Sequence, residues 1–282
     1  NYAALMIDLK RSRSYSVEDR TSIQEYMLTV IQSLNKLFSK TLAMDVEFSA
    51  GDEVQGLFTF PEAAYLYFRL FCMLVFPVES RAGIGVGEWN VKIKNASTAA
   101  QDGPAYHNAR YAIEQVKAVP GYSILFYTES ETDLFLNAAA NMFFALTGSH
   151  SEYQNELMLL LELLYPINCY HAIDCEKIKL LSTLITEKNK LHYYMEYKKS
   201  RSVKKYPFDK AEYMEFESIP INAAEDDSTF YVSGGMKRGM ITKLSEALNI
   251  SRQTIEKTVK TANIYEARNS VIVTLKFMDQ YL

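Results

Sequence analysis

Cysteine is scarce in this chain, and that scarcity excludes a disulfide-stapled secreted scaffold. Only 3 of the 282 residues are cysteines. An odd and small number of thiols is typical of a protein kept in a reducing environment, so we expect a cytoplasmic location. The first residues already form a strand-like run, and we therefore expect no signal peptide.

Long hydrophobic runs are also missing, which argues against a membrane partner. The most apolar stretch, residues 63–78, contains Arg69 and ends in a turn with a proline. A helix that crosses a bilayer needs about 20 apolar residues. The sequence also lacks an internal repeat, a G-x-x-x-x-G-K phosphate loop and a Ser/His/Asp or Cys/His nucleophile set.

The charge is close to balanced over the whole chain but not along it. The formal net charge is −4, which excludes a polycationic nucleic-acid coat. Residues 234–282 carry eight basic and four acidic side chains. A local basic patch can contact nucleic acid even when the total charge is negative.

Hydrophobic periodicity divides the chain into three parts. Residues 1–130 show the order β-α-β-β-α-β-α-β, with helical spacing at 19–40. Residues 131–233 are helical and mixed, and residues 234–282 are helical after a predicted hinge at Gly234–Gly235. We therefore predict an α/β (α+β) domain at 1–130, a connector at 131–233 and a C-terminal domain at 234–282.

Two acids of the first domain form the strongest candidate site. Asp8 closes the first predicted strand, and Asp52 lies in the turn of a predicted hairpin, between Gly51 and Glu53. The β-α-β-β order places the first strand beside that hairpin in an antiparallel sheet, so the two aspartates converge at one edge. Hard oxygen ligands and an open face suit Mg²⁺ or Mn²⁺. We predict Asp8, Asp52 and Glu53 as metal ligands.

A basic loop follows Asp8 directly and precedes a helix. Backbone N–H groups at a helix start, together with cations, can hold the phosphates of a nucleoside triphosphate. The predicted nucleotide-binding residues are Lys10, Arg11, Ser12, Arg13 and Gly51. Each acid also has a purely local interpretation, as turn chemistry for Asp52 and as a helix cap for Asp8.

Four sequence blocks carry a family resemblance. They are Asp8, 50–54 (AGDEV), 81–88 (RAGIGVGE) and 103–110 (GPAYHNAR). In this order they resemble the SatD family, and also the palm of class III nucleotide cyclases and of GGDEF diguanylate cyclases. The resemblance covers residues 2–130 and implies a ferredoxin-like nucleotide-cyclase palm that binds Mg²⁺ and a nucleoside triphosphate.

The chain departs from the cyclase pattern at the catalytic positions. The cyclases carry an Asn and, four residues later, an Arg in the helix that begins at Pro104, where this chain has His107 and Tyr111. Asn108 and Arg110 lie nearby and are the candidate catalytic residues, but side chains two residues apart do not share a helix face. The resemblance therefore supports metal and phosphate binding more than turnover.

Residues 241–260 match a helix-turn-helix position by position. Leu244 and Leu248 form the core face of a first helix, and Asn249 suits a left-handed turn. Ser251 caps a second helix, which presents side chains suited to base edges and phosphates. The predicted DNA-binding residues are Arg252, Gln253, Thr254, Lys257 and Lys260. The alternative is a small helical bundle that contacts only protein.

Together these features predict a regulatory protein that binds Mg²⁺ and a nucleotide through its first domain and DNA through its last. Palm relatives bind their ligand between two subunits, and a helix-turn-helix reads two half-sites, so we expect a homodimer. One alternative is an active nucleotidyl cyclase, or a related nucleotidyltransferase, that makes a cyclic or linear nucleotide signal. Another is an interaction protein with a relic palm.

Overall fold

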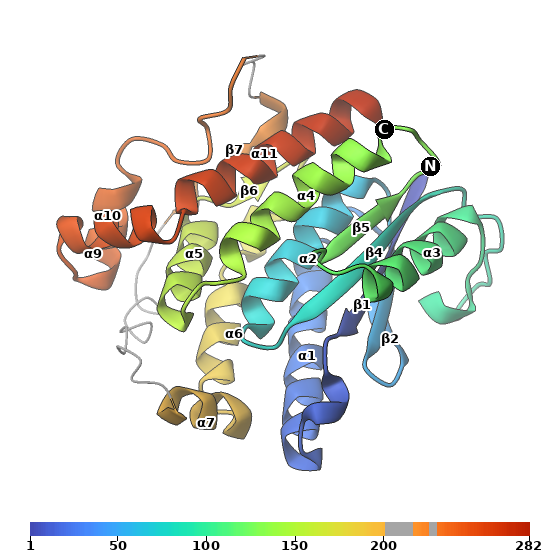
Figure 1. The fold of residues 1–282 in the computed structure, drawn as a ribbon, viewed down its shortest axis with the longest axis horizontal. Coiled ribbons are helices and arrows are strands. Elements are labelled where there is room, and N and C mark those ends of the chain that lie inside the picture. Colours follow the sequence, from blue (N-terminus) through green and yellow to red (C-terminus); the bar gives the residue numbers. More distant parts are fainter. Residues whose placement is uncertain (201–216, 226–229) are drawn as a thin grey trace.

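A five-stranded sheet is the centre of the fold (Figure 1). The structure, a computed structural model, describes residues 1–200, 217–225 and 230–282. The strands of this sheet are β1 (Tyr2–Leu9), β2 (Leu42–Ala50), β3 (Glu53–Phe58), β4 (Ser80–Gly87) and β5 (Ile124–Tyr127). Their spatial order is β2-β3-β1-β4-β5. β1 therefore lies beside the hairpin of β2 and β3, which is the placement that the β-α-β-β order predicts.

The sheet is mixed rather than purely antiparallel. β1 is antiparallel to β3 and β4, and β2 is antiparallel to β3, but β5 runs parallel to β4. The predicted antiparallel arrangement is correct for the first four strands and wrong for the fifth. The reason is the connection, because the chain leaves β4 through α3 (Pro104–Ala118), and such a helical crossover returns a parallel strand.

Helices cover both faces of the sheet. α1 (Val17–Leu37) and α2 (Pro61–Val75) belong to the hydrophobic cluster on one face, which includes Leu5 of β1. α3 packs on the other face, against Ala4 and Met6. Successive side chains of a strand point to opposite faces. This alternation decides which charged residues at the end of β1 meet α3.

Glycines in β4 allow α3 to lie close to the sheet. A Cβ atom placed on Gly85 would lie 2.0 Å from the backbone nitrogen of Ala109, and one placed on Gly83 would lie 2.3 Å from that of Ile113. The three glycines in the sequence block 81–88 (RAGIGVGE) predict such a close backbone approach. The structure confirms it and identifies α3 as the neighbour.

Among the residues that the structure describes, the second half of the chain is mainly helical. Its elements are α4 (Asp133–Thr147), α5 (Glu152–Leu164), α6 (Leu180–Lys188), α7 (His192–Ser200), the strand pair β6 (Ile167–Asn168) and β7 (Ile221–Asn222), α9 (Met240–Leu248), α10 (Arg252–Thr261) and α11 (Ile264–Tyr281). α11 lies along α4 and also contacts α2 (Figure 1). One hydrophobic cluster contains side chains from β1 through α11. The domain boundaries after residues 130 and 233 stay predictions.

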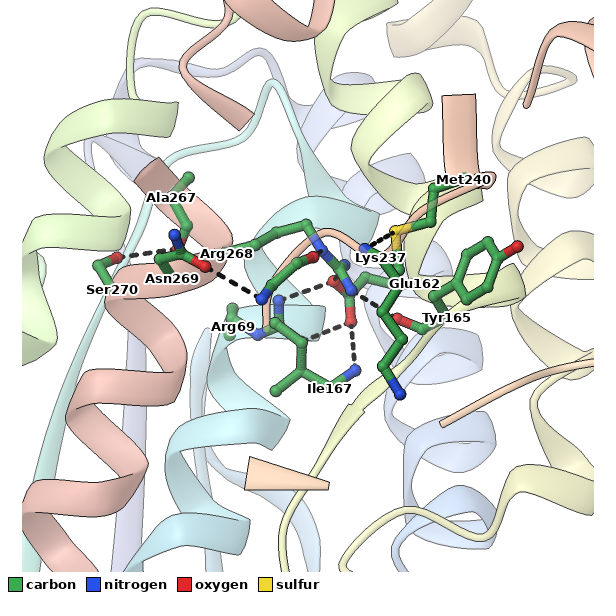
Figure 2. A network of polar contacts seen from close by, with 11 residues as sticks. Arg69, Glu162, Tyr165, Ile167, Lys237, Met240, Ala267, Arg268, Asn269 and Ser270 are labelled. Carbon is green, nitrogen blue, oxygen red and sulfur yellow. Dashed lines mark hydrogen bonds and ion pairs between the residues drawn. The ribbon is translucent and has the colours of Figure 1, made fainter. Parts of the chain in front are cut away.

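A buried ion network joins α2, α5 and α11. Figure 2 shows Arg69 from α2, Glu162 from α5 and Arg268 from α11 pointing toward one another, and all three side chains are fully buried. Arg69 donates two hydrogen bonds to the Glu162 carboxylate, at 3.0 and 2.6 Å. Arg268 donates to the same carboxylate and, at 2.6 Å each, to the carbonyl oxygens of Tyr165 and Gly235.

This network attaches the C-terminal segment to the sheet domain. Burial by itself raises the pKa of Glu162, but the charges of Arg268 and Arg69 outweigh it and hold the pKa below its ordinary value. Gly235, in the predicted hinge, is buried and donates its N–H to the Asn269 side chain at 3.0 Å. The expected hinge is therefore held in place at this residue.

We predict that Glu162→Gln lowers the free energy of unfolding by about 3 to 5 kcal/mol, because it leaves two buried guanidinium groups without their counter-charge. Urea unfolding measures the change. Glu114→Gln, at an exposed position on α3, is the matched control and should change the stability by no more than about 0.5 kcal/mol.

The pH dependence of this effect has a defined sign. Since the folded-state pKa of Glu162 lies below its ordinary value of 4.5, the ion pairs stabilise the fold above that pH, and this contribution is lost as the pH falls below it. Wild type should therefore lose stability more steeply than Glu162→Gln on acidification below pH 4.5. Parallel stability curves for the two proteins would contradict the role of the network.

Candidate functional site

Asp8 lies at the end of β1 on the α3 side of the sheet. It continues the alternation of Ala4 and Met6, and its partner in the antiparallel pairing with β4 is Arg81. Nε of Arg81 donates to Oδ2 of Asp8 at 2.7 Å. This predicted metal ligand is therefore paired with a cation in the structure.

Glu53 and two cations from α3 complete this group. The pairing of β1 with β3 ends at Ile7 and Val54, and Asp8 and Glu53 are the next residues on the two strands. Nζ of Lys117 lies 3.6 Å from Oδ1 of Asp8 and 3.9 Å from Oε2 of Glu53, so one ammonium stands between two carboxylates. Nη1 of Arg110 donates to Oε1 of Glu53 at 2.7 Å. We define the edge cluster as Asp8, Glu53, Arg81, Arg110 and Lys117.

The acids of the edge cluster lie deeper than the cations from α3. The side chains of Asp8 and Glu53 are 13% and 16% exposed, whereas those of Lys117 and Arg110 are 35% and 47% exposed. Three cations face two carboxylates, so the cluster as a whole is positive. An anion that approaches from solvent would therefore contact Lys117 and Arg110 before the acids. Because these two side chains are only partly exposed, solvent screens their charges only in part.

Gly51 and Asp52 form the turn that leads into Glu53. Gly51 has a left-handed φ of 60°, a conformation that favours glycine. Oδ2 of Asp52 is buried and has no hydrogen-bond partner within the part of the chain that the structure describes. A buried carboxylate oxygen without a donor is costly, and a cation would satisfy it. The structure thus joins Asp8 with Glu53 through Lys117, and Asp52 stays outside these ion pairs.

The edge does not form a closed metal site from protein ligands alone. Among the residues described, no group of three or more His, Cys, Asp or Glu side chains lies close enough to hold a metal ion. Mg²⁺ is commonly bound by one or two carboxylates together with substrate phosphates. Asp8 and Glu53, with the unpaired oxygen of Asp52 in the adjoining turn, fit that open kind of site.

The basic residues of the loop after β1 do not lie together in the structure. Lys10 lines a cavity on the other face of the sheet, and in residues 1–200, 217–225 and 230–282 it forms no ion pair with the edge cluster. Arg11, with a left-handed φ of 57°, and Arg13 are exposed. Ser12 begins the short 3₁₀ turn Ser12–Ser14. The structure therefore separates Lys10 from the edge cluster.

Asn108 and Arg110 on α3 point in different directions, as their spacing predicts. Asn108 is buried, and its Nδ2 donates to the carbonyl oxygen of Val86 at 2.9 Å, whereas Arg110 belongs to the edge cluster. Sequence reasoning misses Lys117, although it lies two helical turns after Arg110 and so shares its face. It also misses Arg81, which only the pairing of β4 with β1 places beside the first acid.

α9 and α10 present a second candidate site. The turn between them holds Asn249 in the left-handed conformation, with a φ of 52°, and the Ser251 hydroxyl accepts from the Thr254 N–H at 3.2 Å. The apolar positions of the two helices are buried, namely Leu244, Leu248, Ile255 and Val259. The side chains predicted to contact DNA are all exposed on α10, namely Arg252, Gln253, Thr254, Lys257 and Lys260.

These features define an α/β protein with a mixed five-stranded sheet, a charged sheet edge and a helical C-terminal segment. Comparison with protein families assigns it further: residues 2–212 match the SatD family, and the chain belongs to that family. A search of curated proteins found no match, and neither did a search of solved structures. Helices α9 to α11 lie beyond the matched residues. Among the helices that the structure describes, none has the length and apolar character that a membrane crossing requires.

We predict that Lys117→Met increases the affinity for Mn²⁺ in the absence of nucleotide by roughly fivefold to tenfold, because the ammonium no longer competes for the two carboxylates. Electron paramagnetic resonance of free Mn²⁺ measures the binding. Lys94→Met removes the same charge from an exposed position outside the edge cluster, and its affinity should stay at the wild-type value. Equal behaviour of the two variants would show that Asp8 and Glu53 do not hold the metal.

Proposed function

We propose that this member of the SatD family is a nucleotide-linked regulatory protein. In this proposal the edge cluster binds the phosphates of a nucleotide together with Mg²⁺ or Mn²⁺, and α10 contacts DNA. Bound nucleotide then biases the placement of α9 and α10. The proposal is carried by one observation: the ammonium of Lys117 stands between the carboxylates of Asp8 and Glu53, flanked by two arginines.

The strand order supports a nucleotide-binding palm. The elements from β1 to β4 follow the order β-α-β-β-α-β, with β1 between β3 and β4 and both helices in the core of one face. This is the arrangement of ferredoxin-like folds, the type that the resemblance to nucleotide cyclases implies. The end of β1, the turn before β3 and the start of β4 meet at one edge, where that resemblance would put the metal and the triphosphate.

The charges of the edge cluster suit a polyphosphate. In the free protein its cations neutralise Asp8 and Glu53. A phosphate group would draw the more exposed Lys117 and Arg110 outward, since charge-assisted hydrogen bonds to phosphate are strong. Asp8 and Glu53, with Asp52, would then be left to hold a divalent cation, which shields phosphate charge when bound. The cations of the edge cluster would bind the phosphates, and its acids would bind the metal ion.

A helix-turn-helix formed by α9 and α10 would support DNA contact by α10. The left-handed turn at Asn249, the cap at Ser251 and the buried inner faces of both helices fit this motif. The exposed side of α10 offers amide, hydroxyl and basic groups, which suit base edges and phosphates. A homodimer would present two copies of α10 to two half-sites, and it is part of this proposal.

α11 would connect nucleotide binding at the edge cluster with DNA contact by α10. It follows α10 in the chain and is attached to α2 and α5 through Arg268, Arg69 and Glu162. α9 and α10 lie at the opposite end of the long axis from α3 in Figure 1. A nucleotide at the edge cluster would therefore act on α10 through the shared core rather than by direct contact.

We expect at least one of ATP, GTP, CTP and UTP, added with Mg²⁺, to raise the melting temperature by about 5 °C at roughly 100 times its Kd. Arg110→Ala and Lys117→Ala should remove most of that shift because they delete the phosphate-facing cations. Lys94→Ala, an exposed lysine outside the cluster, should keep it. No shift with any nucleotide, or an equal shift in all variants, would refute a nucleotide site at the edge cluster.

The enzymatic alternative is supported by Arg110 alone of the two candidate catalytic residues. The amide of Asn108 is already engaged with the Val86 carbonyl, and its side chain is buried. Chromatography after incubation with each nucleotide and Mn²⁺ separates the two functions. A cyclic or linear product would establish a nucleotidyl cyclase or nucleotidyltransferase, whereas unchanged nucleotide together with the melting shift would support the regulatory protein.

For the DNA contact, Arg252→Ala should weaken binding to a double-stranded promoter fragment by roughly tenfold, the cost of losing a base or phosphate contact. Fluorescence anisotropy at fixed salt measures the affinity, because salt itself changes it. Lys94→Ala is again the charge-matched control. If wild type binds no DNA, or if both variants bind equally, α10 is not a DNA-contacting helix.

A further inference from the structure

A cavity of about 510 Å³ lies on the face of the sheet opposite to the edge cluster. It is bounded by residues from the end of β1, the α2–β4 connection and the junction of α4 with α5. Its apolar wall includes Phe76, Phe143 and Phe144. This volume lies within the range of small-molecule sites in proteins.

Two buried polar atoms of the cavity lining lack partners. Oγ of Ser80 and Nδ1 of His150 have no hydrogen-bond partner in the described residues, and these two residues are only 6% and 7% exposed. Buried polar groups are normally hydrogen-bonded. A polar ligand in the cavity would supply the missing partners.

Lys10 gives the cavity a positive charge. Burial raises the pKa of the Cys72 thiol, which also lines the cavity, and the ammonium of Lys10 offsets part of that rise. Lys10 is half-buried, while Glu79, an acid at the same cavity, is exposed to solvent. Because water screens the exposed acid more strongly than the half-buried ammonium, the cavity favours an anion.

His150 links this cavity to the C-terminal helices. Its Nε2 donates to the carbonyl oxygen of Ala262 at 2.7 Å, since a carbonyl can only accept. Burial lowers the pKa of His150 more than this hydrogen bond raises it, so the ring is neutral at pH 7 and its Nδ1 is an acceptor. Ala262 caps the end of α10, and α11 begins at Ile264. The loop that lines the cavity thus holds the junction of α10 and α11.

We propose that this cavity is an effector site for a small organic anion with an apolar body, and that His150 couples its occupancy to the α10–α11 junction. A carboxylate or phosphate group of the ligand would bind Lys10 and accept from the hydroxyl of Ser80, and a hydroxyl or N–H group elsewhere on the ligand would donate to Nδ1 of His150. An aromatic or aliphatic body would pack against Phe143 and Phe144. The bound ligand would order the loop that carries His150. The hydrogen bond from His150 to the carbonyl oxygen of Ala262 would then become stronger. This site is separate from the edge cluster and does not rest on the proposed nucleotide binding.

Saturation-transfer NMR on the full chain tests the ligand class with phenyl phosphate, benzoate and neutral benzyl alcohol. We expect at least one of the two anions to bind about tenfold or more tightly than benzyl alcohol, which lacks the charge that Lys10 recognises. The preferred anion shows whether the natural ligand group is a phosphate or a carboxylate. Equal binding of all three probes, or no binding of any, would overturn the proposal.

Variants at two lysines locate the bound probe. Lys10→Met should weaken the bound anion about tenfold and leave benzyl alcohol unchanged. Lys94→Met, which removes an exposed charge outside the cavity, should bind every probe as wild type does. Equal anion binding in Lys10→Met and wild type would place the anion elsewhere. The probe signals are read directly, so this result is independent of nucleotide and DNA binding.

Hydrogen exchange of residues 252–262 tests the coupling. With the bound anionic probe, these amides should exchange more slowly in wild type and in His150→Gln, because the glutamine amide can still donate to Ala262. His150→Ala removes that donor and should abolish the protection, even at a probe concentration that fills the cavity. Protection that persists in His150→Ala, or none in wild type, would refute the role of His150.

Discussion

The buried ion network of Arg69, Glu162 and Arg268 is the interaction on which the arrangement of this molecule depends. Two guanidinium groups and one carboxylate lie in the core at zero exposure, where an unpaired charge is strongly unfavourable. α2, α5 and α11 each supply one member of the network, so it forms only when all three helices are in place. The position of the C-terminal helices is therefore linked energetically to that of the sheet domain.

One end of the sheet supplies residues to both candidate ligand sites. Arg81 points to the α3 face and binds Asp8, whereas its neighbour Ser80 lines the cavity on the opposite face. The two-residue alternation of a strand sends adjacent side chains to opposite sides. Glycines in β4 keep α3 close on the first side, and the aromatic residues of α4 bound the second. Two separate sites, one on each face of the sheet, thus depend on the same strand ends.

Local sequence patterns predicted much of this fold and part of the candidate site. The hairpin around Gly51 and the helices on either side of it placed β1 in the middle of the sheet, because short connections leave few topologies. The exposed face of α10 followed from helical periodicity. The parallel return of β5 and the contact of Lys117 with both acids did not follow. The direction of β5 follows from the helical connection through α3, whereas the contact of Lys117 depends on how α3 crosses the sheet, which local spacing does not encode.

Within residues 1–130, the sequence by itself determined the order of strands and helices, a close backbone approach to the glycine-rich strand, and the presence of acids at the end of β1 and in the turn before β3. These features are local, since backbone conformation and side-chain alternation depend on neighbouring residues. Only the tertiary structure decided which charges meet, so that Asp8 and Glu53 are paired with cations and Lys10 lies on the other face. It likewise decided that Arg268 reaches Glu162 across more than 100 residues of chain. Coulomb and packing energies depend on distance in space, and that distance is fixed only when the whole core has assembled.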